Sequence, residues 1–209
     1  MGIDIKSTLG VIIYSNKNLK GYDIMRKDFG SKPWFYPLPV LIVASYDESG
    51  KADAMNAAWG GLYQGDMVEL CLSAGHKTTK NILKTKAFTV SFADEKNVIA
   101  SDYVGMVSGN STPDKMEKSG FTTTKSEKVN APIINELPFA LECEYVKSTE
   151  EGNIIGKIVN ISVDESILDD NGNVDLNKFK PISYEPIENT YRVLGEVVGK
   201  AFSDGNKLK

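Results

Sequence analysis

The feature that most constrains the fold is a period-two alternation of apolar and polar residues in several short segments. Alternation or a short apolar run is found in residues 41–46, 68–73, 88–92, 140–146 and 154–163. This pattern is typical of β-strands, and the last segment, with Ile and Val on both faces, predicts a more enclosed strand. Six or more strands at modest spacing predict a mainly β fold, a barrel or a sandwich, instead of a parallel α/β sheet.

Few segments have the pattern of a helix. Residues 78–84 follow a polar loop, and Thr78 or Thr79 can serve as the N-cap. Residues 94–102 have an acidic first turn, and a further helix is predicted to begin at Thr112-Pro113 and to end at Gly120. Turn residues predict two hairpins, one around residues 47–50 and one at 169–173, between the segments 167–168 and 174–176.

Composition limits the kind of protein and its partners. The chain has 209 residues, of which 41% are hydrophobic and 25% charged, as in soluble globular domains. The formal net charge is −4, so the basic surface of a general nucleic-acid binder is not expected. No apolar run approaches the roughly 18 residues of a membrane-spanning helix, and residues 9–14 do not form a secretory signal. We therefore expect a cytoplasmic protein without a nucleic-acid or membrane partner.

Histidine and cysteine are scarce, and this excludes several chemistries. His76 is the single histidine, and Cys71 and Cys143 are the two cysteines. One chain therefore lacks the ligands for the usual zinc sites, and a Ser-His-Asp triad would depend on His76 without a Gly-x-Ser-x-Gly elbow. Both cysteines lie in apolar segments and are predicted to be buried, with a Cys71–Cys143 disulfide as the alternative.

Three ligand-binding motifs are not supported by the residues. An EF-hand loop that starts at Asp169 would need glycine at its sixth position, which is Val174. The segment from Gly195 to Lys200 is one residue too short for a P-loop, and Ala201 replaces the magnesium-binding Ser or Thr. The Gly-x-Gly-x-x-Gly pattern of the Rossmann fold does not follow any strand, so a nicotinamide cofactor would not be held in the usual way.

Two loops remain as candidate binding segments. In residues 54–61, small residues surround Asn56 and Trp59, which can offer hydrogen bonds and a packing face to a flat ligand. The alternative is a strand that ends in a glycine turn and buries its Trp in the core.

The second loop, residues 73–82, leads into the helix predicted at 78–84. It combines hydroxyls, His76, Lys77 and Lys80 near the first turn, where free N–H groups and the helix dipole favour an anion. The alternative is an ordinary helix capped by Thr, with its lysines in solvent. A planar-ligand loop followed about twenty residues later by an anion loop predicts a mononucleotide site.

Several blocks of the sequence together resemble the flavin reductase-like family and, within it, the flavoredoxins, which have an FMN-binding split barrel. The blocks lie between Met25 and Phe202, in an order that matches the family: FGSKPWFYPLPVLIV (29–43), NAAW (56–59), HKTTKNI (76–82), YVGMVSGN (103–110), PISY (181–184), YRVLGE (191–196) and GKAF (199–202). The resemblance implies a single Greek-key barrel, with few helices, that forms a homodimer with one FMN per subunit near the dimer interface.

The resemblance also implies which residues hold the cofactor. Asn56, Ala57 and Ala58 would line the isoalloxazine, with Trp59 close to it, and Ser73 would lie on the flavin side of its strand. The phosphate and ribityl chain would be held by the four residues His76, Lys77, Thr78 and Thr79. Residues 103–108 would close the pocket. No protein residue is predicted to be catalytic, because the flavin carries the chemistry.

The functional hypothesis is an FMN-dependent oxidoreductase, either an NAD(P)H:flavin reductase or a flavoredoxin-type electron-transfer protein. Its electron donor would be NAD(P)H or a reduced carrier. One alternative is a module that binds or senses flavin or another phosphorylated ligand without catalysis, and another is a structural dimer whose pocket is no longer used. We expect the domain to span residues 25–209 and residues 1–24 to be an N-terminal extension, with weak order in residues 1–8.

Overall fold

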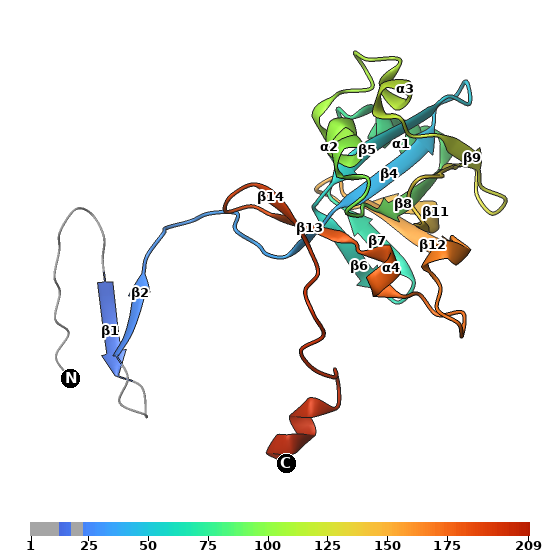
Figure 1. Cartoon of the computed structure of the whole chain (residues 1–209). Helices are drawn as coiled ribbons and strands as arrows, with labels where there is room; N and C mark the ends of the chain where they lie inside the picture. Colours follow the sequence, from blue (N-terminus) through green and yellow to red (C-terminus); the bar gives the residue numbers. More distant parts are fainter. Residues whose placement is uncertain (1–12, 18–22) are drawn as a thin grey trace. The chain divides into compact units, whose positions relative to one another are not determined.

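The computed structural model describes residues 13–17 and 23–209 and contains two compact units, Met1–Phe35 and Tyr36–Lys209 (Figure 1). In the first unit, β1 (Ile13–Lys17) and β2 (Asp23–Lys27) form an antiparallel pair. The predicted weak order of residues 1–8 lies outside the described residues. The boundary after residue 24 falls within β2 and stays a prediction.

The second unit is built on one antiparallel sheet of seven strands, in the order β5-β4-β8-β11-β12-β7-β6. In chain order, its strands are β4 (Leu41–Tyr46), β5 (Ala52–Ala57), β6 (Gly60–Gln64), β7 (Met67–Leu70), β8 (Ala87–Phe92), β11 (Phe139–Ser148) and β12 (Ile154–Val163).

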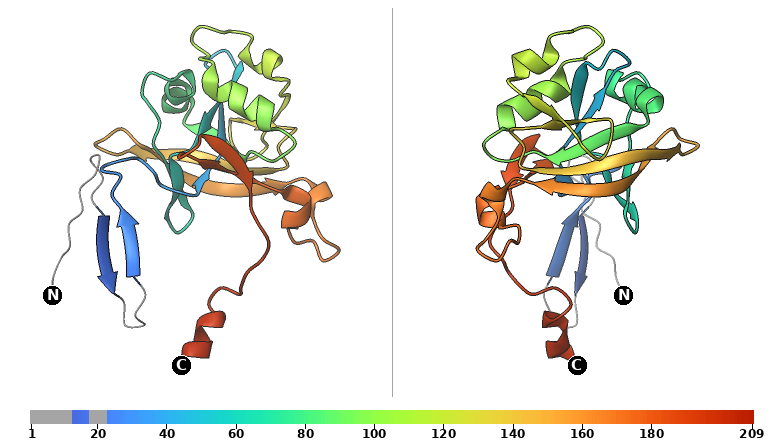
Figure 2. Two further views of the ribbon diagram at one scale, coloured as in Figure 1. Left: turned by 60° about the vertical axis from the view of Figure 1, so that its left-hand side comes forward. Right: turned by 90° about the vertical axis from the view of Figure 1, so that its right-hand side faces the viewer.

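A short connection forces this sheet to curl. Strands β5 and β6 are the two opposite edges of the sheet, yet only Ala58 and Trp59 join them. The edges must therefore come together, and a Cβ added at Gly60 would lie 3.1 Å from Leu41 Cδ1 in β4. Figure 2 shows the curled sheet from two sides. The predicted mainly β barrel is confirmed.

Smaller elements complete the unit. The strands β3 (Leu38–Pro39), β13 (Ile182–Glu185) and β14 (Thr190–Val193) form a second sheet, and β9 (Thr123–Lys125) pairs with β10 (Pro132–Ile134). The helices are α1 (Lys77–Thr85), α2 (Val98–Met106), α3 (Lys115–Ser119) and α4 (Leu176–Phe179), with 3₁₀ turns at Glu165–Ile167 and Asp204–Leu208. Helices α1, α2 and α3 all contact β5, so three helices gather at this edge of the sheet (Figure 1). Among the described residues, no helix is long and apolar enough to cross a membrane.

The packing of the interior explains why residues 41–46 are apolar on both faces of their strand. Strand β4 has both faces buried: Leu41 and Val43 belong to the cluster inside the barrel, while Ile42 and Ala44 belong to a second cluster. The second cluster includes Val104 from α2. An apolar run without alternation is therefore what this central strand requires, because neither face meets water.

Two of the predicted helices begin later than expected. The segment 94–102 was predicted to be helical from Asp94, but Asp94 bridges Pro181 and its carboxylate accepts the Asn97 N–H at 2.9 Å, so α2 begins at Val98. The helix expected at Thr112-Pro113 begins at Lys115, and it ends as predicted at Gly120, whose φ of +78° suits glycine.

Three further expectations need correction. Strand β12 is buried only over its first residues, and Val159 and Ile161 are exposed, so it is less enclosed than predicted. Cys71 is exposed, whereas Cys143 is buried, and both are free thiols, so there is no Cys71–Cys143 disulfide. The turn around Gly172 forms only a single bridge, Leu168 with Val174, because the following residues form α4.

The predicted hairpin between β4 and β5 is confirmed, and Asp47 stabilises its turn. The carboxylate accepts hydrogen bonds from the Ser49 hydroxyl and from the Ser49 and Lys51 N–H groups, and these lower the pKa of Asp47 from 3.8 to about 2. A lowered pKa in the folded state means that the carboxylate stabilises the fold above the unfolded-state pKa.

We therefore expect this contribution to be lost as pH falls from about 4 to about 2. Urea unfolding across this range should show a steeper loss of stability in the wild type than in Asp47→Asn. Parallel curves for the two proteins would contradict the assignment.

Candidate functional site

The first turn of α1 contains the anion loop predicted from the sequence. Lys77–Thr85 is helical and His76 is the N-cap, with φ of −66° and ψ of 142°. The first helical hydrogen bond runs from the Lys80 N–H to the His76 carbonyl at 3.1 Å. Among the residues that the structure describes, no side chain forms a capping hydrogen bond at the N-terminus of α1. The expectation that Thr78 or Thr79 caps the helix is therefore wrong, and the N–H groups of the first helical residues, Lys77, Thr78 and Thr79, are available to an anion.

Thr78 and Thr79 instead lie inside the helix, and each is 1% exposed. The Thr78 hydroxyl donates to the Asp53 carboxylate of β5 at 2.6 Å. The Thr79 hydroxyl is buried and has no hydrogen-bond partner among the residues that the structure describes. An unsatisfied buried hydroxyl in the first turn is unfavourable unless a ligand or water completes it.

Lysines beside this turn have different surroundings. The Lys77 ammonium lies 3.4 Å from Asp47 Oδ2, in an ion pair that is about one-fifth exposed. Lys80 donates to Asn110 Oδ1 at 3.4 Å. Under the alternative of an ordinary capped helix both lysines would lie in solvent; Lys77 is instead paired and partly buried, whereas Lys80 is exposed.

The planar-ligand loop lies where β5 ends. The Asn56 amide donates to the Ser101 carbonyl of α2 at 3.1 Å, so its donor is used within the protein, and Ala57 is buried in the barrel. Trp59 is 60% exposed. This exposure excludes the alternative that Trp59 is a core residue, and it leaves an aromatic face open beside the loop.

The structure brings the two predicted loops together. The Cys71 N–H donates to the Trp59 carbonyl at 2.8 Å, and the bond between Thr78 and Asp53 ties α1 to the strand that ends in Asn56. Ser73 was predicted to lie on a strand, but β7 ends at Leu70 and Ser73 lies in the exposed loop before α1. Its carbonyl accepts the His76 N–H at 3.1 Å, so Ser73 shapes the approach to the helix.

A third segment, Gly109 and Asn110, closes over the anion loop directly after residues 103–108, which were predicted to close the pocket. After α2, Asn110 donates to the Gly75 carbonyl at 3.0 Å. A Cβ added at Gly109 would lie 2.2 Å from Asp53 Oδ1, so only glycine fits there without a shift. The sequence signal that was available is the acidic Asp53 within an otherwise mostly apolar strand, three residues before Asn56.

A cavity of about 250 Å³ adjoins the loop at Asn56 and Ala58. Gly105 and Met106, from the segment 103–108 that was predicted to close the pocket, border this cavity. Tyr184 and Tyr191 form another wall, and the Tyr191 hydroxyl donates to Asp102 at 2.7 Å. Burial and the Asp102 carboxylate raise the pKa of Tyr191, so the phenol stays protonated.

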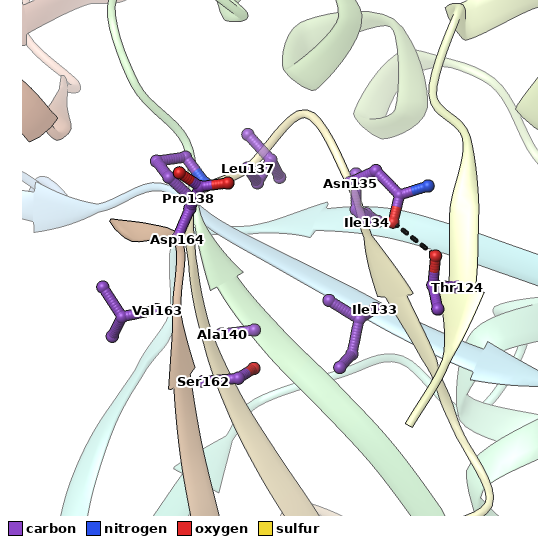
Figure 3. Close-up of a pocket in the computed structure, with 10 residues that line it drawn as sticks. All are labelled: Thr124, Ile133, Ile134, Asn135, Leu137, Pro138, Ala140, Ser162, Val163 and Asp164. Carbon is purple, nitrogen blue, oxygen red and sulfur yellow. Dashed lines mark hydrogen bonds between the residues drawn. The ribbon is translucent and has the colours of Figure 1, made fainter. Parts of the chain in front are cut away.

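A second cavity, of about 380 Å³, lies between β9–β10 and the paired ends of β11 and β12 (Figure 3). It is lined by Thr124, Ile133, Ile134, Asn135, Leu137, Pro138, Ala140, Ser162, Val163 and Asp164. Thr124 and Asn135 bond to each other at 2.8 Å, and Asp164 caps the following 3₁₀ turn (Figure 3). None of the predicted site residues, all of which are described, lines this cavity.

Neither the cysteines nor metal chemistry adds a candidate centre. Burial raises the pKa of the Cys143 thiol to about 12, so it is not a nucleophile at neutral pH. In the ranges that the structure describes, no group of three His, Cys, Asp or Glu side chains is placed to hold a metal ion.

The curled antiparallel barrel, with a helix N-terminus beside the loop that joins its edges, is the architecture of FMN-binding split barrels. Residues 34–185 match the sequence profile of the family described as "Flavin reductase like domain". The chain belongs to this family.

Solved structures place it near the flavoredoxins within the family. The flavoredoxin of Desulfovibrio vulgaris (Miyazaki F) is 34% identical and superposes with a TM-score of 0.83 over 87% of this chain and 100% of that one. The flavoredoxin of Methanosarcina acetivorans is 27% identical, with a TM-score of 0.79 over 88% of this chain and 100% of that one. These relationships support a flavin-related redox function and a flavin cofactor.

Curated relatives match over shorter stretches. An uncharacterized protein of Aquifex aeolicus is 32% identical over 133 residues, which are 61% of this chain and 62% of that protein. An uncharacterized protein of Aeropyrum pernix is 27% identical over 121 residues, 56% of this chain and 45% of that protein. The chain thus spans about half of the length of these two relatives.

Proposed function

We propose that this protein binds FMN and works as a flavoredoxin-type oxidoreductase that passes electrons through the bound flavin. The observation that carries the proposal is that the two predicted loops lie next to each other. The uncapped first turn of α1 is bonded to β5 through Thr78 and Asp53, and the Cys71 N–H is bonded to the Trp59 carbonyl in the loop that contains Asn56. An anion subsite beside a planar-ligand subsite fits a flavin mononucleotide.

The hydrogen-bond donors in the first turn of α1 fit the phosphate group of FMN. The buried Thr79 hydroxyl, which lacks a partner among the described residues, and the uncapped N–H groups of α1 are donors that a phosphate would satisfy. His76, Lys77, Thr78 and Thr79 would surround the phosphate and ribityl chain, with Ser73 shaping the entry to the turn.

The ring end of the proposed site is formed by Asn56, Ala57, Ala58 and Trp59. The small side chain of Ala58 lets a flat ligand approach the backbone, and the exposed Trp59 offers a packing face. The Ala57 side chain is buried in the barrel, so Ala57 would line the ligand through its backbone. When bound, FMN would supply hydride acceptance and the onward transfer of one or two electrons. The protein's part is to bind and orient the flavin, and we assign no protein acid, base or nucleophile.

We further propose that the protein is a homodimer with NAD(P)H or a reduced carrier as electron donor. Apolar side chains left exposed beside the proposed site, Trp59 at 60% and Leu62 at 76%, support burial against a second copy. The electron donor distinguishes the two versions of the function: NAD(P)H for the flavin reductase and a reduced carrier for the electron-transfer protein.

The visible spectrum of the purified protein tests the proposal. We expect flavin absorption bands, before or after reconstitution with FMN, and sedimentation as a dimer. Bleaching of the bound flavin by NADH or NADPH under anaerobic conditions would assign the reductase version. Bleaching by a reduced protein carrier alone would assign the electron-transfer version.

A flavin that only dithionite bleaches would favour the alternative, a binding or sensing module without catalysis. Purified protein that takes up no FMN on reconstitution would overturn the proposed function.

A further inference from the structure

A buried carboxylate lies beneath the proposed phosphate subsite. Asp53 is 3% exposed, and it accepts the Thr78 hydroxyl in the first turn of α1 at 2.6 Å. Gly109 closes over it, since a Cβ there would lie 2.2 Å from Asp53 Oδ1. The positive end of the helix dipole therefore already faces one negative charge before any ligand binds.

A buried lysine accompanies this carboxylate. Lys115 is 4% exposed and belongs to α3, which packs against β5. The charges that act on its ammonium are the Asp53 carboxylate and the Lys77 ammonium. Burial lowers the pKa of Lys115, and the Asp53 charge opposes this shift. The Lys115 ammonium has no ion pair within 4.0 Å in the part of the chain that the structure describes.

Charge balance around the turn depends on this lysine. Lys77 is paired with Asp47 at 3.4 Å, whereas Lys115, buried on the helix that packs against β5, has a charge that interacts with Asp53. The charges of these four groups, Asp47, Asp53, Lys77 and Lys115, sum to zero. A phosphate monoester brings close to two further negative charges, and in a buried setting their repulsion by an uncompensated carboxylate is strong.

We propose that two buried charges on neighbouring elements, Asp53 and Lys115, determine the preference of this site for the phosphorylated flavin. Lys115 neutralises Asp53, so that the first turn of α1 accepts a second anion, and it acts as a positioning charge without touching the ligand. The inference rests on the proposed function and adds to it a specificity-determining residue.

The experiment compares FMN with riboflavin, which lacks the phosphate, by the change of flavin fluorescence on titration with purified protein. In Lys115→Met, we expect FMN to bind about tenfold more weakly or worse, because the negative charge of Asp53 is no longer compensated, while riboflavin changes by less than about threefold. Asp53→Asn keeps an acceptor for Thr78 and should raise the preference for FMN. The double variant should return to the wild-type ratio.

The matched control is Lys118→Met on the same helix, because Lys118 is exposed and paired with Asp114 at 2.9 Å. It should leave both affinities unchanged. If Lys115→Met does not fold, Asp53→Asn and the double variant still test the inference. An unchanged ratio of FMN to riboflavin affinity in Asp53→Asn would overturn it.

Two other results would also overturn it: an equal loss of FMN and riboflavin binding in Lys115→Met, or a double variant that does not recover the wild-type ratio. A wild type that binds neither flavin would instead overturn the proposed function itself, and this inference with it.

Discussion

Replacing Thr78 by valine is expected to cost about 2 kcal/mol of unfolding free energy and to weaken FMN binding by about tenfold or more. The substitution keeps the shape of the side chain but removes the hydroxyl that donates to Asp53 at 2.6 Å. Both residues are buried, Thr78 at 1% and Asp53 at 3% exposure, so water cannot replace the lost bond without opening the structure. An unsatisfied buried carboxylate bears the full desolvation penalty.

The same bond fastens the first turn of α1 to β5, so its loss should also displace the proposed phosphate subsite. Chemical denaturation and FMN titration measure the two effects. Thr85→Val is the matched control: its hydroxyl donates to the Asn81 carbonyl at 3.0 Å, one turn earlier in the same helix, with the Ala87 carbonyl at 3.5 Å as a second acceptor. We expect a change within about 0.5 kcal/mol. Equal effects of the two substitutions would contradict the assigned role of Asp53.

Replacing Gly156 by alanine is expected to destabilise the barrel by about 1–3 kcal/mol. In β12, a Cβ at this position would lie 2.3 Å from Phe88 Cζ, 2.7 Å from Phe88 Cε1 and 3.3 Å from the Glu144 carbonyl oxygen. Phe88 is fully buried in the barrel core, so its ring cannot move aside without disturbing the packing around it.

Phe88→Leu tests this explanation because it removes the ring edge that Gly156→Ala would strike. In the Phe88→Leu background, the alanine should cost at least about 0.5 kcal/mol less, a coupling that a double-mutant cycle measures by chemical denaturation. Gly61→Ala is the control, since a Cβ at Gly61 meets nothing within 4 Å. Additive effects of the two core substitutions would show that the ring is not the obstacle.

The extent of the strands was largely predictable, and the helix boundaries were less so. Leu41–Tyr46 and Ile154–Val163 have the bounds that their apolar pattern predicts. Helix α2 begins four residues after the predicted start, because Asp94 is held by a bridge to Pro181, nearly ninety residues further along the chain. A local pattern carries no information on a contact of that separation.

The two loops of the candidate site could be predicted from the sequence, but the buried charged residues that lie behind them could not. Asn56, Trp59 and Thr78 were identified from small residues and hydroxyls in two loops. Asp53 and Lys115 were not identified, because both become buried only when α3 packs against β5. From sequence alone, a charged residue is expected to lie in solvent.

The sequence by itself determined the alternation that makes strands, the scarcity of histidine and cysteine that excludes zinc sites, and the loop chemistry suited to a mononucleotide. The tertiary structure decided how these parts meet. Only two residues join β5 to β6, and the sheet must therefore curl. The pairing of β6 with β7 then sets Trp59 beside Cys71, and the packing of α1 on β5 sets Thr78 against Asp53. Because periodicity describes which face of a strand is buried and not which strands become neighbours, the site and its buried charges emerge only when the barrel closes.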